Sequence, residues 1–365
     1  MKVMRPWLVA PRTIEYRQQE IHLTPNAVLV KHVCTAPSQG TAIHRYLAEE
    51  IELDSYNRQK SGGPFPYPWL QGFAYGVGRI EEVGAKVKSV KKGQLIYSQK
   101  LIADLSVLDP SDLILLPDGL DPESAAMLLQ AEVGLKGARA AKIVLGDIVL
   151  VTGQGPIGNF AAQLCKLTGA YQVVVSDLSD LKLQISLQMD IDLVLNPRTT
   201  DLLNCMEEFT HGRGADVVVE SSGSSEAFLQ GCGAAAAGGR IVVLGWILDS
   251  CWFNMSESFT PKGLEMVVCH AGQLGDWQLA RRRLRSRGMR GHGLSKASVS
   301  LNSPLNDDYL YLMDLMAEGK LKAKELITHR FPIDDLVQVW DEFVNPLDTS
   351  VHGEYAQILF TSDNV

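Results

Sequence analysis

Short apolar runs rich in valine and isoleucine recur through the middle of the chain. Within each run the apolar residues do not alternate with polar ones, which is typical of strands buried on both faces of a sheet. Other stretches, such as residues 157–169, predict helices between them. The predicted strands are residues 147–153, 171–177, 193–197, 215–223, 239–245 and 264–270. This alternation predicts an α/β protein with a doubly wound parallel sheet.

The two ends of the chain have a different pattern. Residues 1 to about 120 are predicted to be mostly β, and glycines, prolines and turns separate the strands. An apolar helix is predicted from Pro122. The C-terminal part predicts two helices and a final strand, at residues 307–321, 333–344 and 355–360. A chain of 365 residues favours two domains.

Composition narrows the function classes only slightly. Hydrophobic residues make up 46% and charged residues 21%, an ordinary globular balance. The net charge of −8 argues weakly against a nucleic-acid partner. Six scattered cysteines lack Cys-x-x-Cys spacing, so we expect neither a disulfide framework nor a zinc knuckle. Without a long apolar run or a signal-peptide pattern, we expect a cytoplasmic protein with no membrane partner.

The most informative motif is Gly-Gln-Gly-Pro-Ile-Gly at residues 153–158, between a predicted buried strand and a predicted helix. In that context Gly153 allows a tight turn, Gly155 lets the backbone approach a pyrophosphate, and Gly158 lets the helix pack closely. Pro156 and Ile157 lie where the predicted helix starts, and the free N–H groups at a helix start favour negative charge. The motif predicts dinucleotide binding; the alternative is a glycine-rich turn without a ligand.

Asp177 ends the next predicted strand, 24 residues after Gly153. That is near the spacing of roughly 20 residues expected for an acid that binds the ribose hydroxyls. Because a carboxylate there repels a 2′-phosphate, we expect NAD(H) to be favoured over NADP(H); the alternative is a helix N-cap. Gly223 and Gly245 end two further strands, where ligands of such sheets bind. We therefore expect both beside the cofactor.

These features together resemble the medium-chain dehydrogenase/reductase family. The resemblance covers nearly the whole chain and is carried by residues 81–97, 113–128 and 326–343 (EEVGAKVKSVKKGQLIY, LILLPDGLDPESAAML and LITHRFPIDDLVQVWDEF). It implies a Rossmann domain at residues 126–275. It also implies a β-rich, GroES-like catalytic domain made from both chain ends, residues 1–125 and 276–365. In such a fold the backbone at His270 would lie near the nicotinamide.

The chain departs from the family's zinc members at each metal-ligand position. Gln39 stands where those members have a cysteine, and Phe73 and Ala74 stand where they have histidine and glutamate. The third ligand position holds Leu129 or Gln130. Phenylalanine and leucine cannot coordinate a metal, and glutamine is a poor zinc ligand. We therefore expect no zinc. The segment "SQGT" also resembles a zinc-less branch with the motif S-x-G-T-E, found in some secondary-metabolism enzymes, although Ala42 replaces its glutamate.

Without a metal, side chains must supply or take the proton of the substrate oxygen. The resemblance places Thr41 and His44 at the positions of the family's proton relay, and an ordinary histidine pKa suits that role. Tyr75 is a third candidate, as an acid or hydrogen-bond donor; the alternative is a packed aromatic residue. For His44 the alternative is a surface position on a short helix.

Residues 276–300 contain an arginine-rich segment, whose arginines are 281, 282, 283, 285, 287 and 290. It predicts either contacts to an anionic substrate or a solvated or subunit-facing helix. The resemblance implies a homodimer or homotetramer that acts on a small-molecule substrate.

Three functions remain open at this stage. The first is hydride transfer between nicotinamide and a carbonyl or secondary alcohol without zinc. The second is an enoyl or quinone reductase that acts on a conjugated double bond. The third is a nucleotide-binding sensor or partner protein without catalysis.

Overall fold

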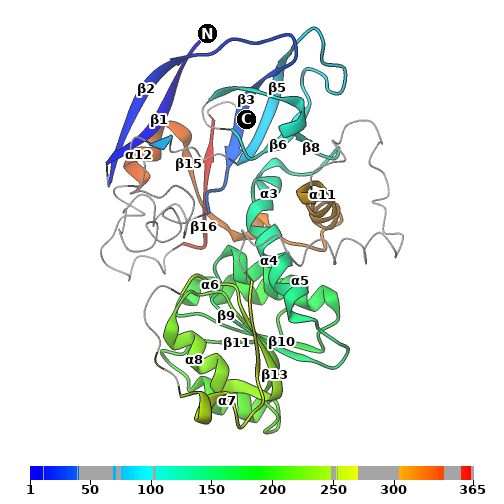
Figure 1. The fold of residues 1–365 in the computed structure, drawn as a ribbon, viewed down its shortest axis with the longest axis vertical. Helices are drawn as coiled ribbons and strands as arrows, with labels where there is room; N and C mark the ends of the chain where they lie inside the picture. The colour runs from blue at the N-terminus through cyan, green and yellow to red at the C-terminus, as the bar shows by residue number, and fades with distance from the viewer. Residues whose placement is uncertain are drawn as a thin grey trace. The chain divides into compact units, whose positions relative to one another are not determined.

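The computed structural model describes residues 1–10, 12–38, 40, 69–70, 75–101, 104–247, 252, 254–269, 304–340 and 355–362 (Figure 1). The chain divides into two compact units. Unit 1 contains Met1–Leu129, Gly293–His352 and Gln357–Val365, and unit 2 contains Gln130–His292 and Gly353–Ala356. The expected segment 276–300, with its arginines, lies outside the described residues.

Unit 2 is built on a six-stranded parallel sheet with the strand order β11-β10-β9-β12-β13-β14. The strands are β9 (Ile148–Thr152), β10 (Gln172–Ser176), β11 (Leu193–Leu195), β12 (Ala215–Glu220), β13 (Ala235–Val243) and β14 (Glu265–Val268). In chain order this is 3-2-1-4-5-6, the doubly wound order of a dinucleotide-binding sheet. All residues of β9 are buried, as its uninterrupted apolar run predicts. The predicted fold class is confirmed.

Helices connect these strands. They are α4 (Leu128–Ala141), α5 (Pro156–Thr168), α6 (Asp180–Ser186), α7 (Leu202–Phe209), α8 (Ser225–Ala234) and α9 (Met255–Ser258), with a short 3-10 turn at Leu187–Met189. Helices α5 and α8 pack on the central strands (Figure 1). Because the apolar side chains of strands and helices meet there, the core of unit 2 includes Leu150, Val218 and Phe228.

Unit 1 is rich in β structure, as the N-terminal pattern predicts. Its larger sheet has the order β15-β16-β3-β5-β6-β8, and β7 also pairs with β3. These strands are β3 (Val28–Thr35), β5 (Gly76–Val83), β6 (Leu95–Ser98), β7 (Leu105–Leu108), β8 (Ile114–Leu115), β15 (Ile327–Pro332) and β16 (Gln357–Thr361). Strand β16 pairs in parallel with β15 and antiparallel with β3, so the last strand lies inside the sheet.

The described part of unit 1 contains one longer helix, α11 (Pro304–Ala317), and several short helical turns. The short ones are α3 (Pro122–Ala126) and α12 (Leu336–Val339), with 3-10 turns at Pro110–Asp112, Lys324–Leu326 and Ile333–Asp335. The helix predicted at 333–344 therefore begins as a 3-10 turn, and residues 341–344 lie outside the described part. Arg330 forms a two-pronged ion pair with Glu123, with both N–O distances at 2.8 Å, and so joins β15 to α3.

A hairpin of β1 (Lys2–Ala10) and β2 (Thr13–Glu20) begins the chain and pairs with β4 (Trp69–Leu70). The apolar pattern does not predict β2, because seven of its eight residues are exposed and these seven are polar or aromatic. All eight residues of β2 are paired with β1. Among the described residues, no helix has the length and apolar composition that crossing a membrane requires.

Candidate functional site

The predicted phosphate loop forms a tight turn between β9 and α5. Gly153 has a φ of 84°, a left-handed conformation that favours glycine, and its N–H donates to Ser176 at 2.8 Å. Gly155 is the N-cap of α5 and supplies no side-chain cap. A β-carbon at Gly155 would meet no atom within 4 Å, so the backbone is open there. The first N–H groups of α5 therefore have no side-chain cap at Gly155 and suit an anion.

Gly158 has the opposite environment, because it is buried where α5 approaches the strand before it. A β-carbon at this position would overlap the carbonyl oxygen of Gly153 and the hydroxyl of Ser221. The partly exposed Pro156 and Ile157 lie between the open and the closed glycine. The turn thus has the geometry that lets a backbone approach a phosphate group on one side and pack closely on the other.

Asp177 follows β10 and is half-buried beside the same turn. Its Oδ2 accepts a hydrogen bond from the N–H of Gln154 at 2.6 Å, and its Oδ1 accepts one from the N–H of Ser179 at 2.8 Å. Helix α6 is capped by Ser179 and not by Asp177. The N-cap alternative is therefore wrong. Each carboxylate oxygen has a second lone pair, which a ribose hydroxyl can use.

Gly223 and Gly245 follow β12 and β13 at the same carboxyl edge of the sheet. Gly223 has a φ of 74° and donates its N–H to the carboxylate of Glu220 at 2.9 Å. Gly245 donates its N–H to the carbonyl of Glu220 at 2.8 Å. Both glycines are therefore held by Glu220, a residue that the sequence analysis did not single out.

Asn196 is a second residue that the sequence analysis missed. Its side-chain amide donates to the carboxylate of Asp180 at 2.6 Å, and its Oδ1 accepts from the N–H of Arg198 at 3.0 Å. It thus links the turn after β11 to the turn that follows Asp177. An asparagine followed by a proline at the end of an apolar run is a turn signal that could have identified it.

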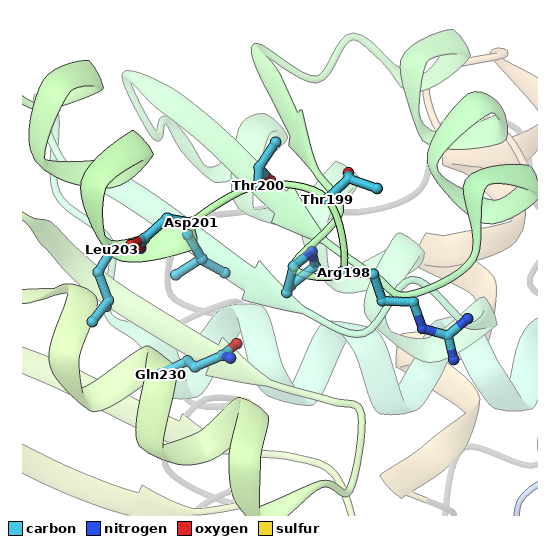
Figure 2. A pocket seen from close by; sticks show the side chains of 8 residues that line it. Arg198, Thr199, Thr200, Asp201, Leu203 and Gln230 are labelled. Carbon is cyan, nitrogen blue, oxygen red and sulfur yellow. The ribbon is translucent and has the colours of Figure 1, made fainter.

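A shallow cavity of about 400 Å³ lies beside this turn (Figure 2). Residues from the turn and from the start of α7 line it, and Gln230 of α8 completes it. The lining residues are Pro197, Arg198, Thr199, Thr200, Asp201, Leu202, Leu203 and Gln230. Asp201 caps α7 through Leu203 and Asn204, so it is already engaged in the fold.

Of the three predicted catalytic residues, the structure describes Tyr75. Thr41 and His44 lie outside the described residues, as do Gln39, Phe73, Ala74 and His270. Tyr75 is described and half-buried, and its phenol oxygen accepts a hydrogen bond from the N–H of Ser38 at 2.5 Å. The Thr35 hydroxyl donates to the carbonyl of Tyr75. Tyr75 is thus hydrogen-bonded to the segment that leads into Thr41.

The turn between β9 and α5 offers hydrogen-bonding groups that suit a dinucleotide. The open anion position at Gly155 and the carboxylate of Asp177 fit a pyrophosphate and a ribose. Within the part of the chain that the structure describes, no three histidine, cysteine, aspartate or glutamate residues are grouped as metal ligands. At the family's third ligand position, Leu129 offers no donor atom, and the alternative, Gln130, is a poor zinc ligand.

Comparisons with known proteins agree with this geometry. The profile of a family described as zinc-binding dehydrogenase matches residues 156–286. An alcohol dehydrogenase of Cupriavidus necator is 30% identical over 234 residues, which are 64% of this chain and 56% of that enzyme. An L-threonine 3-dehydrogenase of Anaeromyxobacter dehalogenans is 27% identical over 333 residues, covering 83% of this chain and 84% of that enzyme.

A solved structure supports the fold over nearly the whole length. It is a Sinorhizobium meliloti protein, described as a zinc-binding dehydrogenase and bound to NADP, with a TM-score of 0.73 and 18% identity. The match covers 99% of each chain. At that identity the likeness concerns the fold alone. The region matched in the Cupriavidus enzyme is little more than half of its length.

Proposed function

We propose that the chain is a member of the medium-chain dehydrogenase/reductase family and a nicotinamide-dependent oxidoreductase acting on alcohols or carbonyls. One observation carries the proposal. The uncapped start of α5 at Gly155 lies next to the carboxylate of Asp177, so an anion position and a ribose acceptor occur at one turn. Dinucleotides are bound by that combination.

The cofactor would supply the hydride acceptor or donor when bound. In our proposal the N–H groups at the start of α5 bind its pyrophosphate, and Gly158 keeps the helix close enough to present them. Asp177 accepts hydrogen bonds from the ribose hydroxyls. We infer NAD(H) over NADP(H), because a 2′-phosphate would place negative charge against this carboxylate.

We further propose that the reaction proceeds without zinc. The residues at the family's ligand positions support this. Phe73 has no donor atom, and the third position holds either Leu129, which has none, or Gln130, which is a poor zinc ligand. Thr41 and His44 would then move the proton between the substrate oxygen and solvent, and Tyr75 would donate a hydrogen bond to that oxygen. The substrate would be a small metabolite with a carbonyl or secondary alcohol.

The first experiment titrates the purified, chelator-treated protein with NADH and NADPH and measures both dissociation constants by fluorescence. Tighter binding of NADH is the expected result. Absence of binding by either nucleotide would overturn the proposal. A panel of alcohols, carbonyls and enones then tests turnover. Nucleotide binding without turnover on any member would instead favour a non-catalytic binding protein.

Elemental analysis of the same sample addresses the metal. We expect less than one zinc per chain and unchanged turnover after chelation. One tightly held zinc per chain, with activity lost on its removal, would contradict zinc independence while leaving the cofactor proposal intact.

Light scattering after gel filtration tests the further proposal of a homodimer or homotetramer; a monomer would contradict it.

A further inference from the structure

Glu220 is a buried acidic residue at the carboxyl end of β12. Its side chain has no exposure to solvent, at 0%. Among the described residues it takes part in no ion pair. A buried carboxyl group without a basic partner is costly and needs strong hydrogen bonds to persist. Burial raises the pKa of this carboxyl, while hydrogen bonds from the following loop oppose that shift.

The first oxygen of the carboxyl group organises the loop after β12. Glu220 Oε1 accepts hydrogen bonds from the N–H of Ser222 at 2.7 Å, the hydroxyl of Ser222 at 2.5 Å and the N–H of Gly223 at 2.9 Å. The hydroxyl of Ser222 in turn accepts from the N–H of Ser224 at 3.1 Å. The loop therefore folds around the carboxyl group of Glu220 as if around a bound anion.

The Glu220 carbonyl and the Ser221 hydroxyl form hydrogen bonds with two more loops. Its carbonyl accepts from the N–H groups of Leu244 and Gly245 at 2.7 and 2.8 Å, which fixes the turn after β13. The neighbouring Ser221 donates its hydroxyl to the carbonyls of Thr152 and Gly153, at 2.8 and 2.9 Å. The loops after β9, β12 and β13 thus meet at residues 220 and 221.

The second oxygen of the carboxyl group faces Gly245. A β-carbon at Gly245 would stand 2.6 Å from Glu220 Oε2, so glycine at 245 leaves the space that this oxygen needs. Oε2 is buried and has no hydrogen-bond partner among the described residues. The carboxyl group therefore lies between the loop after β12, which contacts Oε1, and the loop after β13, which contacts Oε2.

We propose that Glu220 is a positioning residue for the nicotinamide dinucleotide. It sets the backbone of residues 222–224 and 244–245 at the sheet edge that binds the cofactor, without touching the cofactor itself. The inference rests on the proposed function, since it concerns the same site. Glu220 does this through the hydrogen bonds that its oxygen accepts and through the shape of its side chain, and not through its negative charge.

Three variants and a matched control test this role. Glu220→Ala removes the acceptor, Glu220→Gln keeps an acceptor oxygen of the same shape, and Ser222→Ala removes one of its donors. Thr210→Val is the control, because Thr210 is also buried and ties a loop of unit 2. Its hydroxyl bonds Met206 and Gly214, at the amino end of β12 and away from the cofactor edge.

The readout is the dissociation constant of NADH, measured by fluorescence at 25 °C, with circular dichroism as the check of folding. We expect Glu220→Ala to weaken binding about tenfold and Ser222→Ala about threefold, consistent with loss of hydrogen bonds that order the site. Glu220→Gln should stay within about twofold of the wild type. Thr210→Val should lower the melting temperature but leave the constant unchanged.

Each result has one meaning. If the wild type binds NADH and Glu220→Ala binds it equally well, the positioning role is refuted. Equal weakening by Gln and Ala would also refute it, because the amide oxygen would then fail as a replacement. If the Ala variant does not fold, the Gln and Ser222→Ala variants decide the question. A wild type that binds no nucleotide refutes the proposed function, and the inference falls with it.

Discussion

Lowering the pH from 7.5 to 5.0 should destabilise unit 1 through a single side chain, His32. This histidine lies in β3 and is 2% exposed. Its Nδ1 is 2.9 Å from the hydroxyl of Ser362, and its Nε2 has no hydrogen-bond partner among the described residues. Burial lowers the pKa of the His32 imidazole to about 4, so the folded protein holds it neutral.

The magnitude follows from proton linkage. In the unfolded chain this imidazole takes up a proton below about pH 6.5, whereas in the folded protein it does so only below about pH 4. Between those values the unfolded state binds more protons, so stability falls as the pH falls. The neutral His32 makes its full contribution to the free energy of unfolding above about pH 6.5. At pH 5.0 about 2 kcal/mol of that contribution is lost, out of ~3.4 kcal/mol for the full pKa shift.

The assay compares the free energy of urea unfolding at pH 7.5 and pH 5.0 for the wild type and for His32→Gln. Because glutamine does not titrate, the variant should lose about 2 kcal/mol less than the wild type between the two conditions. His22→Gln is the control, since that imidazole is 74% exposed, and it should behave as the wild type. Equal pH dependence in the wild type and His32→Gln would refute the reasoning.

Three other predictions concern unit 2 and the α3–β15 contact. Asp177→Ala should narrow the affinity gap between NADH and NADPH by about 1.5 kcal/mol, roughly tenfold, in fluorescence titrations; an unchanged ratio would remove Asp177 from cofactor selection. Gly158→Ala should destabilise the fold by about 1–3 kcal/mol and weaken NADH binding, because the added methyl overlaps Gly153 and Ser221. Ala161→Gly is the control substitution in the same helix. Gly169→Ala is unsuitable as a control, because Gly169 has a φ of 115°. A double-mutant cycle on Glu123 and Arg330 should give a coupling energy of about 0.5–1 kcal/mol in urea unfolding, since both side chains are partly exposed; zero coupling would show that the pair adds nothing.

The sheet of unit 2 could be predicted because its signals are local. Uninterrupted apolar runs mark strands buried on both faces, and β9, β10 and β12 all lie inside the predicted ranges. The motif at residues 153–158 is also local in sequence, although Gly158 packs against the distant Ser221. The tight turn at Gly153 follows from its own φ, which the motif predicts.

Other features depend on contacts between distant segments and could not be predicted in the same way. Asp177 was expected from its spacing, yet its bond to Gln154 spans 23 residues. Glu220 carries no motif of its own, and its importance appears only when the loops after β12 and β13 are seen together. Strand β2 lacks alternation, so only its pairing with β1 reveals it.

The place of β16 within the larger sheet of unit 1 has a consequence for synthesis on the ribosome. Phe360 pairs with both Phe331 of β15 and Thr35 of β3. The sheet that contains the N-terminal strands is therefore complete only after β16 has been synthesised. Unit 2 is almost continuous in the chain and can fold as it emerges. Assembly of unit 1 would then be the later and slower step, during which its unpaired strands are exposed to aggregation and to chaperones.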